Sequence, residues 1–137
     1  MNLSQKKYYQ QVNTNKTGLS LWEYPVLPHI VKGSKILELG GGNGFFAEYL
    51  TNNFQADVTV VELSDNNIQA LAKKNIKYCQ ADLEKAELPF AENSFDCIIM
   101  LEVIEHLFNH YGALKEIQRL LKPSGKLIIS THNAFNI

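Results

Sequence analysis

Short apolar runs alternate with amphipathic stretches over most of this sequence. Runs rich in Val, Ile and Leu with turn residues between them are typical of strands buried in a sheet, and apolar residues at helical spacing follow three of them. The pattern predicts five strands, at residues 35–39, 56–63, 75–80, 95–101 and 126–131, and three helices, at residues 43–52, 65–74 and 111–121. Because strands and helices alternate, we expect a parallel sheet covered by helices on both faces.

Residues 1–33 precede this regular pattern and are polar and aromatic. Pro25 can form the first residue of a short helix, which Lys32-Gly33 would end. The apolar face of that helix would consist of Val26, Leu27, Ile30 and Val31. We therefore expect a helical leader, residues 1–33, that packs on the sheet of a domain formed by residues 34–137.

Composition and charge narrow the class of protein. A chain of 137 residues, 45% of them hydrophobic, fits one domain with a substantial core. The net charge is -1 and no basic stripe is present, so no nucleic-acid partner is indicated. No apolar run approaches the roughly 20 residues that span a bilayer, and the N-terminus lacks the apolar centre of a secretion signal, which predicts a cytoplasmic protein with no membrane partner. Cys79 and Cys97 fall on predicted strands that would not be neighbours, so we expect no disulfide.

The first predicted strand runs into a glycine-rich loop, Gly40-Gly41-Gly42-Asn43-Gly44. Glycine allows positive φ and lets a ligand lie directly against the backbone, so this loop predicts a binding site for a flat or anionic group. A dinucleotide fingerprint needs glycine at its first, third and sixth places. Counted from Gly40, the third place is Gly42 but the sixth is Phe45, which disfavours a nicotinamide cofactor.

The loop and the strand before it contain Glu38, Gly40, Gly42 and Gly44 in the pattern acidic-x-Gly-x-Gly-x-Gly. This pattern resembles the first motif of the class I S-adenosylmethionine-dependent methyltransferases. Leu88-Pro89-Phe90 and Ser94-Phe95-Asp96 are also similar to that family, and the resemblance extends over about residues 34–133. It implies a Rossmann-like, doubly wound α/β fold with five parallel strands in the order 3-2-1-4-5, which binds S-adenosylmethionine and releases S-adenosylhomocysteine.

Two acidic residues at strand ends are candidate cofactor ligands. Glu62 follows the glycine loop by about 20 residues, the spacing at which an acidic side chain accepts hydrogen bonds from both ribose hydroxyls; a solvated side chain is the alternative. The resemblance implies that Asp82 accepts from the adenine amino group while the next backbone amide meets the ring. The alternative for Asp82 is a cap on the turn at residues 83–86.

The complete set of expected cofactor-binding residues is Glu38, Gly40, Gly41, Gly42, Glu62, Leu63, Asp82, Leu83 and Leu101. In methyltransferases of this kind an N-terminal segment often folds over the cofactor. The resemblance therefore makes Tyr8 and Tyr9 of the leader further candidates for lining the site, with surface or core aromatic residues as the alternative.

The stretch from Glu102 to His106 resembles the Glu-x-x-Glu-His sequence of the ubiquinone-biosynthesis type of O-methyltransferase. On a helix, Glu102, Glu105 and His106 could share one face, where a neutral imidazole could take a proton from an acceptor. Two alternatives stay open: the three side chains hold a divalent ion, or they form an acidic first turn with a capping histidine. We predict His106 as the catalytic residue and assign no metal. His132, where relatives usually have proline, is a second candidate for acid/base chemistry.

Methyltransferases of this class normally continue past the fifth strand with a helix and an antiparallel pair of strands, whereas this sequence stops at Ile137. We therefore expect a truncated sheet whose last edge is covered by a missing C-terminal segment or by a second copy of the chain. The predicted function is methyl transfer to an oxygen or nitrogen of a small-molecule acceptor. The alternatives are a cofactor-binding module that is catalytically silent alone and a nicotinamide-dependent oxidoreductase.

Overall fold

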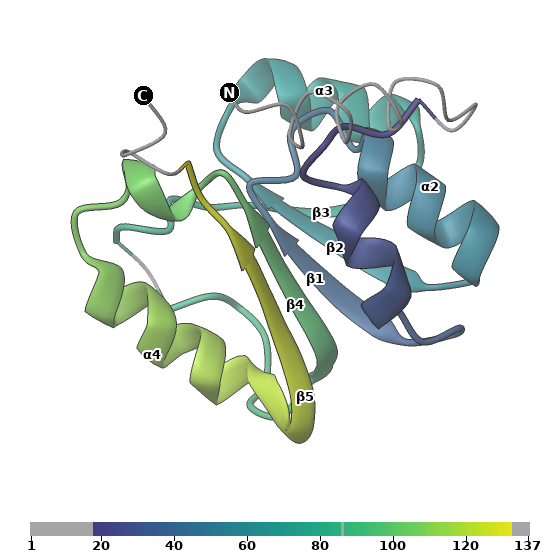
Figure 1. The fold of residues 1–137 in the computed structure, drawn as a ribbon. Coiled ribbons are helices and arrows are strands. Elements are labelled where there is room, and N and C mark those ends of the chain that lie inside the picture. Colours follow the sequence, from purple (N-terminus) through teal and green to yellow (C-terminus); the bar gives the residue numbers. More distant parts are fainter. Residues whose placement is uncertain (1–17, 86, 133–137) are drawn as a thin grey trace, which may run out of the picture.

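Five parallel strands form one sheet in the order β3-β2-β1-β4-β5, which confirms the predicted order (Figure 1). This computed structural model describes residues 18–85 and 87–132. The strands are β1 (Lys35–Leu39), β2 (Asp57–Glu62), β3 (Lys77–Gln80), β4 (Phe95–Leu101) and β5 (Leu121–Ser130). The helices are the 3₁₀ helix η1 (Tyr24–His29), α2 (Phe45–Phe54), α3 (Asp65–Lys73), the 3₁₀ helix η2 (Ile104–His106) and α4 (His110–Leu120).

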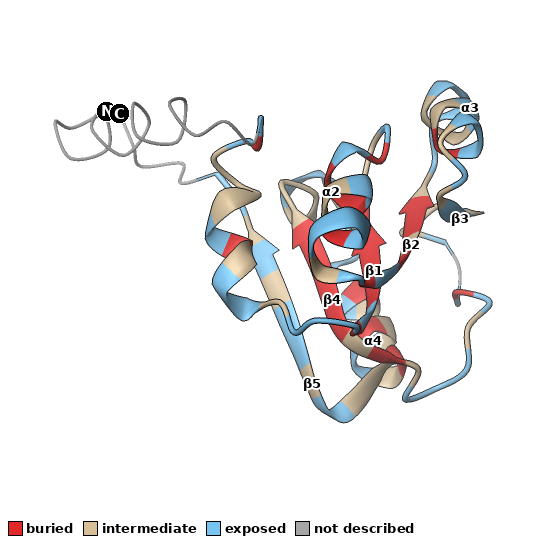
Figure 2. Cartoon of the chain, turned by 90° about the vertical axis from the view of Figure 1, so that its right-hand side faces the viewer, coloured by how far each residue is buried: buried red, intermediate tan, exposed pale blue. Residues whose placement is uncertain are grey.

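The helices cover the two faces of the sheet separately. Figure 1 shows η1, α2 and α3 on one face and α4 on the other. The side chains of β1 alternate accordingly, since Ile36 packs with the α2 face while Leu37 and Leu39 pack with the α4 face. In Figure 2, β1 and β4 are largely buried, as parallel strands between two helical layers must be, whereas β5 is intermediate to exposed along its length.

The register of the strands brings their carboxyl ends to one edge of the sheet. Leu39 of β1 pairs with Val61 of β2 and with Met100 of β4, and β5 continues this register beside β4. The glycine loop and the residues that follow β2, β4 and β5 therefore meet at this edge. The strand order also reverses here, between β1 and β4, which is where ligands bind in open α/β sheets.

Several element boundaries differ from the predicted ones by one or two residues, and the starts of α2 and β3 do so because single residues adopt positive φ. α2 begins at Phe45 rather than at residue 43, since Gly44, with φ +81°, caps the helix and the Asn43 side-chain oxygen accepts from the Phe45 N–H at 3.1 Å. The third strand begins at Lys77 rather than at residue 75, because Asn75 has φ +56° just after α3. The glycine loop therefore comprises all of residues 40–44.

The prediction that residues 122–125 separate α4 from a strand at 126–131 is wrong. β5 begins at Leu121, directly after α4, and ends at Ser130. The register against β4 shifts between Phe95 and Cys97, so the sequence Lys-Pro-Ser-Gly is accommodated as an irregularity within the strand. A proline and a glycine are tolerated there because β5 lies at the edge of the sheet formed by the described residues. That a further segment or a second copy covers this edge stays a prediction.

The described part of the leader packs on the α2 face of the sheet. Leu19 and Val26 are buried in the same core cluster as Ile36 and Val58. The leader helix is η1, a 3₁₀ helix, and Pro28 inside it cannot supply a backbone donor. Tyr8 and Tyr9, the predicted aromatic candidates, lie outside the described residues.

Both cysteines are free thiols, as predicted. Cys79 lies on β3 and Cys97 on β4, with two strands between them. Burial raises the pKa of the Cys97 thiol to about 11, so this thiol is a buried apolar group rather than a nucleophile. None of the helices within residues 18–85 and 87–132 is long and apolar enough to cross a membrane.

Candidate functional site

A cavity of about 220 Å³ lies at the glycine loop, between the leader and the carboxyl ends of β1 and β4. Its walls come from three parts of the chain that are distant in sequence. They are Ser20, Trp22 and Glu23 of the leader, Glu38 with the glycine loop and the start of α2, and Leu101 with Glu102 at the end of β4. We call this the glycine-loop cavity. It brings together the predicted residues Glu38, Gly40, Gly41, Gly42 and Leu101.

The glycines of the loop differ in the space beside them. A Cβ atom at Gly40, Gly41 or Gly44 would lie 2.5 to 2.8 Å from neighbouring side chains, so the packing of the protein itself closes these positions. A Cβ atom at Gly42 would meet no described atom within 4 Å, and Gly42 has φ +59°. Among these four glycines, Gly42 is therefore the one whose backbone faces open space, as the close approach of a ligand requires.

Glu38 is a buried acid directly beneath this loop. The residue is only 6% exposed, and its Oε2 atom is buried with no hydrogen-bond partner among the described residues. Burial, together with the charges of Glu23 and Glu62, raises the pKa of Glu38 to about 8. No Lys, Arg or His is found among the described residues that line the cavity. A cationic ligand group would relieve the cost of this arrangement, and the α-ammonium and sulfonium groups of S-adenosylmethionine fit it.

Glu62 lies on the β2 side of the glycine loop, outside the lining of the cavity. Its Oε2 accepts from the Gly42 N–H at 2.9 Å, while its Oε1 accepts from the N–H groups of Leu63 and Ser64 at 2.8 and 3.1 Å. One carboxylate thus fixes both the loop and the chain that enters α3. The predicted contact of Glu62 and Leu63 with a ribose stays a prediction.

Asp82 caps the turn that follows β3. Its Oδ1 accepts from the Glu84 N–H at 2.9 Å, and its Oδ2 lies 3.4 Å from the Lys85 ammonium. Capping is the alternative that the sequence leaves open for this residue, and it does not prevent the second oxygen from accepting another donor. Leu83 packs on the α4 face of the sheet. Adenine binding by Asp82 and Leu83 stays a prediction.

Glu102, Glu105 and His106 do not share one face of a helix, although both the general-base and the divalent-ion hypotheses assume that they do. η2 spans only Ile104–His106, and Glu102 precedes it with φ +55°, a conformation that is rare for residues other than glycine. His106 is exposed, and we find no hydrogen bond or ion pair of its imidazole within residues 18–85 and 87–132. Its predicted role as the general base is therefore not supported by a partner in the described part of the chain.

Glu102 and Glu105 instead converge on His132, which follows β5. The His132 Nδ1 lies 3.2 Å from the Glu105 Oε1 and also forms an ion pair with the Glu102 carboxylate. The Ser130 hydroxyl donates to the Glu102 Oε1 at 2.7 Å. The rings of His132 and Trp22 are in contact, with centroids 5.2 Å apart. Trp22 and Glu102, which His132 contacts, both line the glycine-loop cavity.

The charges of this cluster shift the pKa values of its members. The hydrogen bond with Glu105, followed by the charge of Glu102, raises the pKa of His132. Burial acts to raise the pKa of Glu105, but hydrogen bonds from its own backbone amide and from His132 outweigh burial, and the pKa is lowered. Oxygen and nitrogen atoms of Glu102, Glu105 and His132 lie within 4.8 Å of one another, a spacing that a cation could bridge. Since an imidazolium already compensates one of the two carboxylate charges, we assign no metal.

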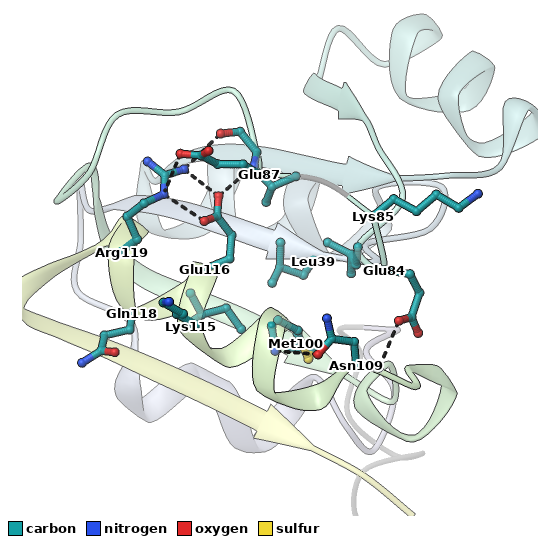
Figure 3. Close-up of a pocket in the computed structure, with 15 residues that line it drawn as sticks. Leu39, Glu84, Lys85, Glu87, Met100, Asn109, Lys115, Glu116, Gln118 and Arg119 are labelled. Carbon is teal, nitrogen blue, oxygen red and sulfur yellow. Dashed lines mark hydrogen bonds and ion pairs between the residues drawn. The ribbon is translucent and has the colours of Figure 1, made fainter.

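A larger cleft, of about 580 Å³, lies on the opposite face of the sheet, between α4 and the residues after β3 (Figure 3). We call this the α4-face cleft. Leu39 and Met100 of the sheet contribute apolar surface to it, and charged side chains surround it. Figure 3 shows Glu84 turned toward Asn109. The backbone N–H of Asn109 donates a hydrogen bond to the Glu84 Oε2 at 3.1 Å. The cleft is larger than the glycine-loop cavity, but it contains none of the loop glycines.

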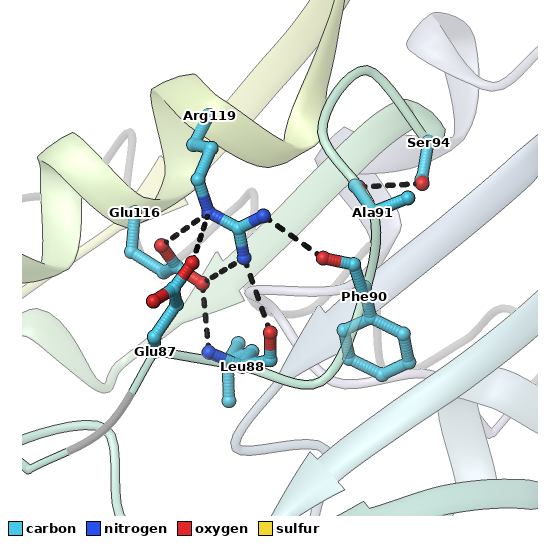
Figure 4. A network of polar contacts seen from close by, with 7 residues as sticks. All are labelled: Glu87, Leu88, Phe90, Ala91, Ser94, Glu116 and Arg119. Atoms are coloured by element: carbon cyan, nitrogen blue, oxygen red, sulfur yellow. Dashed lines mark hydrogen bonds and ion pairs between the residues drawn. The ribbon is translucent and has the colours of Figure 1, made fainter.

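Arg119 of α4 connects this helix to the loop before β4 (Figure 4). Its guanidinium donates to both carboxylate oxygens of Glu116, at 2.8 and 2.6 Å, and to the carbonyls of Phe90 and Leu88, at 2.9 and 3.1 Å. Glu116 also accepts from the Leu88 N–H at 2.7 Å. The hydrogen bond with Arg119 lowers the pKa of Glu116. These polar groups satisfy one another, so the network holds the loop on the helix.

Sequence patterns missed Trp22 and Glu23, although one signal for Glu23 was present. The spacing Ser20-x-x-Glu23 is that of a capping box: the Ser20 N–H donates to the Glu23 Oε2 at 2.7 Å, and the Glu23 N–H donates to the Ser20 Oγ at 3.3 Å. That pattern predicts a local turn. It does not predict that the turn lies beside the end of β1.

Comparison with known proteins identifies the family. A family profile described as "Methyltransferase domain" matches residues 37–129, most of the chain. The chain is 32% identical over 108 residues to the ubiquinone/menaquinone biosynthesis C-methyltransferase UbiE of Haemophilus ducreyi, which covers 72% of this chain and 41% of that protein. The corresponding protein of Legionella pneumophila is 34% identical over 122 residues, which covers 80% of this chain and 48% of that protein. The chain thus spans less than half the length of these curated relatives.

Solved structures share the fold. An S-adenosylmethionine-dependent methyltransferase from Mesorhizobium loti superposes with a TM-score of 0.73 at 25% identity, over 83% of this chain and 55% of that one. Coclaurine N-methyltransferase bound to N-methylheliamine and S-adenosylhomocysteine has a TM-score of 0.68 at 23% identity, over 77% of this chain and 32% of that one. This chain belongs to the S-adenosylmethionine-dependent methyltransferase family, as its motifs imply.

Proposed function

We propose that this domain, within its whole protein, takes part in transfer of the methyl group of S-adenosylmethionine to an oxygen or nitrogen atom of a small-molecule acceptor. The observation that carries the proposal is the Glu38 carboxyl group, which is buried and unpartnered among the described residues beneath the glycine loop. Membership of the family supports the choice of donor. When bound, the donor supplies an electrophilic methyl group and leaves as S-adenosylhomocysteine.

The residues of this chain would bind and orient the reactants. Glu38 would bind the ammonium group, the open backbone at Gly42 would lie against the donor, and Glu62 would accept from the ribose. Asp82 and the Leu83 amide would hold the adenine. Holding the acceptor in line with the methyl group supplies much of the rate in a reaction of this kind, and a hydroxyl acceptor must also lose its proton.

We propose His132 as the group that takes this proton, with His106 as the other candidate. His132 pairs with Glu102, which lines the glycine-loop cavity, and with Glu105. The neutral imidazole would accept the proton, and the two carboxylates would stabilise the imidazolium that forms. Because its pKa is raised from 6.5, the neutral form of His132 appears only at higher pH, so the rate should rise with pH in a region above 6.5.

The test uses the full-length protein, labelled donor and the small-molecule fraction of a cell extract, with mass spectrometry of the products. We expect a product methylated on oxygen or nitrogen. His132→Gln should lower the rate by about 10² to 10⁴ and remove the rise with pH, while His106→Gln should be nearly as active as the parent. The opposite result for the two variants would support the original assignment of His106.

Two other outcomes would correct the proposal. The curated relatives are named as C-methyltransferases, so a label on carbon would replace the oxygen or nitrogen acceptor by a carbon one. Binding of S-adenosylhomocysteine with no transfer to any acceptor would support a binding module that is silent alone. We also propose that the protein is cytoplasmic, which its two free thiols support.

A further inference from the structure

We propose that Glu23, on the leader, is a second acidic ligand for the α-ammonium group of the methyl donor and acts together with Glu38. This inference rests on the proposed function, because it concerns how the same cavity holds the same molecule. Glu23 lies outside residues 37–129, the part of the chain that matches the family profile. The proposal therefore assigns a ligand-binding role to the leader of this particular chain.

The Glu23 carboxylate is held in place at the wall of the cavity. Its Oε2 accepts from the Ser20 N–H at 2.7 Å, and its own N–H donates to the Ser20 hydroxyl at 3.3 Å. Both residues line the glycine-loop cavity, and so does the neighbouring Trp22, which contacts the His132 ring. Little ordering is then needed when a ligand binds, which favours affinity.

The size of the cavity and the position of Glu62 indicate which end of the donor lies there. Sites for whole drug-sized ligands measure about 300 to 1,000 Å³, so a cavity of about 220 Å³ holds only part of such a molecule. Glu62, the predicted ribose ligand, lies on the other side of the glycine loop and does not line the cavity. The remaining part of the donor is its amino-acid end.

The charge of the cavity selects the ammonium group of that end. Glu23, Glu38 and Glu102 line it, and no described lining residue is basic. Glu38 is 6% exposed, and one of its oxygens has no hydrogen-bond partner among the described residues. The acidic groups whose charges act on Glu38 are Glu23 from the leader and Glu62 from β2, and Glu102, just after β4, lines the same cavity. A cation between Glu23 and Glu38 would satisfy both carboxylates.

Binding should therefore be coupled to proton release. With its pKa raised to about 8, Glu38 is mostly protonated at neutral pH in the free protein. An ammonium group beside it favours the ionised form, so binding displaces this proton. The affinity for the donor should consequently rise with pH toward about pH 8 and fall again where the ammonium group of the ligand loses its own proton.

The experiment is titration calorimetry with two probes. S-adenosylhomocysteine carries the amino-acid end, while 5′-methylthioadenosine has the same adenine, ribose and thioether without it. Glu23→Gln keeps an oxygen that can accept from the Ser20 N–H but removes the charge. Glu48→Gln is the matched control, because it removes one charge from α2, where Glu48 pairs with Lys74, away from the cavity lining.

Glu23→Gln should weaken binding of S-adenosylhomocysteine about tenfold and leave 5′-methylthioadenosine within about twofold of the parent, whereas Glu48→Gln should change neither. Titrations in buffers of different ionisation enthalpy should show proton release with S-adenosylhomocysteine and none with 5′-methylthioadenosine. Equal losses for both probes, or no loss for either, would overturn the role of Glu23 while the cofactor site stands. If neither probe binds the parent, the proposed function fails as well.

Discussion

The glycine-loop cavity and the α4-face cleft differ in how their polar groups are satisfied. The cleft is the larger of the two, about 580 Å³ against about 220 Å³, yet Arg119 and Glu116 at its rim pair with each other and with backbone groups. In the smaller cavity the buried acid Glu38 keeps an oxygen without a partner among the described residues. Native proteins rarely leave such an atom unpaired without reason.

A buried polar atom without a hydrogen-bond partner is therefore a better indicator of the ligand site than the volume of a cavity. The Arg119–Glu116 pair at the rim of the cleft is already satisfied and offers a charged ligand no free buried group. A small cavity with a fixed, unbalanced charge selects its ligand by that charge, and here the selected charge is positive. The following predictions separate the two regions by experiment.

The largest expected effect concerns the pH dependence of stability at Glu38. Its folded pKa of about 8 lies above the ordinary value of 4.5, so the folded protein holds a proton that the unfolded chain releases between these values. The free energy of unfolding should therefore fall as pH rises through this window, by an amount on the order of 5 kcal/mol.

Glu38→Gln provides the control, because it keeps the shape of the side chain without the titration. Denaturant unfolding should show the variant close to the parent below pH 4.5 and more stable above pH 8. His132, with its own raised pKa, also loses stability as pH rises, but it does so in both proteins. If the free energy of unfolding depended on pH in the same way in parent and variant, ionisation of the buried Glu38 would not destabilise the fold.

Glu116→Ala should destabilise the fold without weakening cofactor binding. The substitution removes the carboxylate that accepts from the Leu88 N–H and from the Arg119 guanidinium, which keeps Glu87 at 3.5 Å as an acidic partner, and hydrogen bonds to charged groups are worth about 1.5 to 3 kcal/mol. Denaturant unfolding and calorimetry with S-adenosylhomocysteine measure the two effects. A tenfold loss of affinity in a folded variant would assign the α4-face cleft to the binding site.

Glu62→Ala differs from Glu116→Ala in that it should lower affinity as well as stability. The ribose would lose a charged acceptor, and the N–H groups of Gly42, Leu63 and Ser64 would lose their partner. Calorimetry should show affinity for S-adenosylhomocysteine reduced by about tenfold or more. An unchanged dissociation constant would leave Glu62 as a cap of the chain that enters α3.

The smallest expected change in stability comes from Gly42→Ala, compared with Gly33→Ala. Both glycines have positive φ, +59° and +76°, and both have open space at the Cβ position. Each substitution should therefore cost about 1 to 2 kcal/mol of stability. Only Gly42→Ala should also lose affinity for S-adenosylhomocysteine, since only Gly42 lines the glycine-loop cavity. Equal affinities in the two variants would show that the loop does not contact the cofactor.

The sequence predicts the sheet well where local and tertiary preferences agree. β1 and β4 match the predicted ranges because their apolar runs are buried between helical layers. β5 does not, because Pro123 and Gly125 are turn signals that an irregular edge strand can contain. Local patterns carry no information about which strand lies at the edge and tolerates them.

In the candidate site, too, some residues can be predicted from the sequence and others cannot. Glu38 and Glu62 are predictable because they stand at fixed distances from the glycine loop. The place of Glu23 is not, because it depends on how the leader packs. His132 is a predicted candidate, but its pairing with Glu102 and Glu105 is not predictable, because it depends on the register that pairs Leu101 with Ser130. The expectation that Glu102, Glu105 and His106 share a helical face is wrong because only a short 3₁₀ helix forms after β4.

Hydrogen exchange with and without a saturating ligand tests the central claim most directly. With S-adenosylhomocysteine, we predict slower exchange at residues 38–44, at Glu62 and Leu63 and at the Leu83 amide, and no change in α4. NADH should protect neither region. Protection confined to α4 and the residues after β3, or protection of the glycine loop by NADH but not by S-adenosylhomocysteine, would contradict the assignment of the glycine-loop cavity as the methyl-donor site.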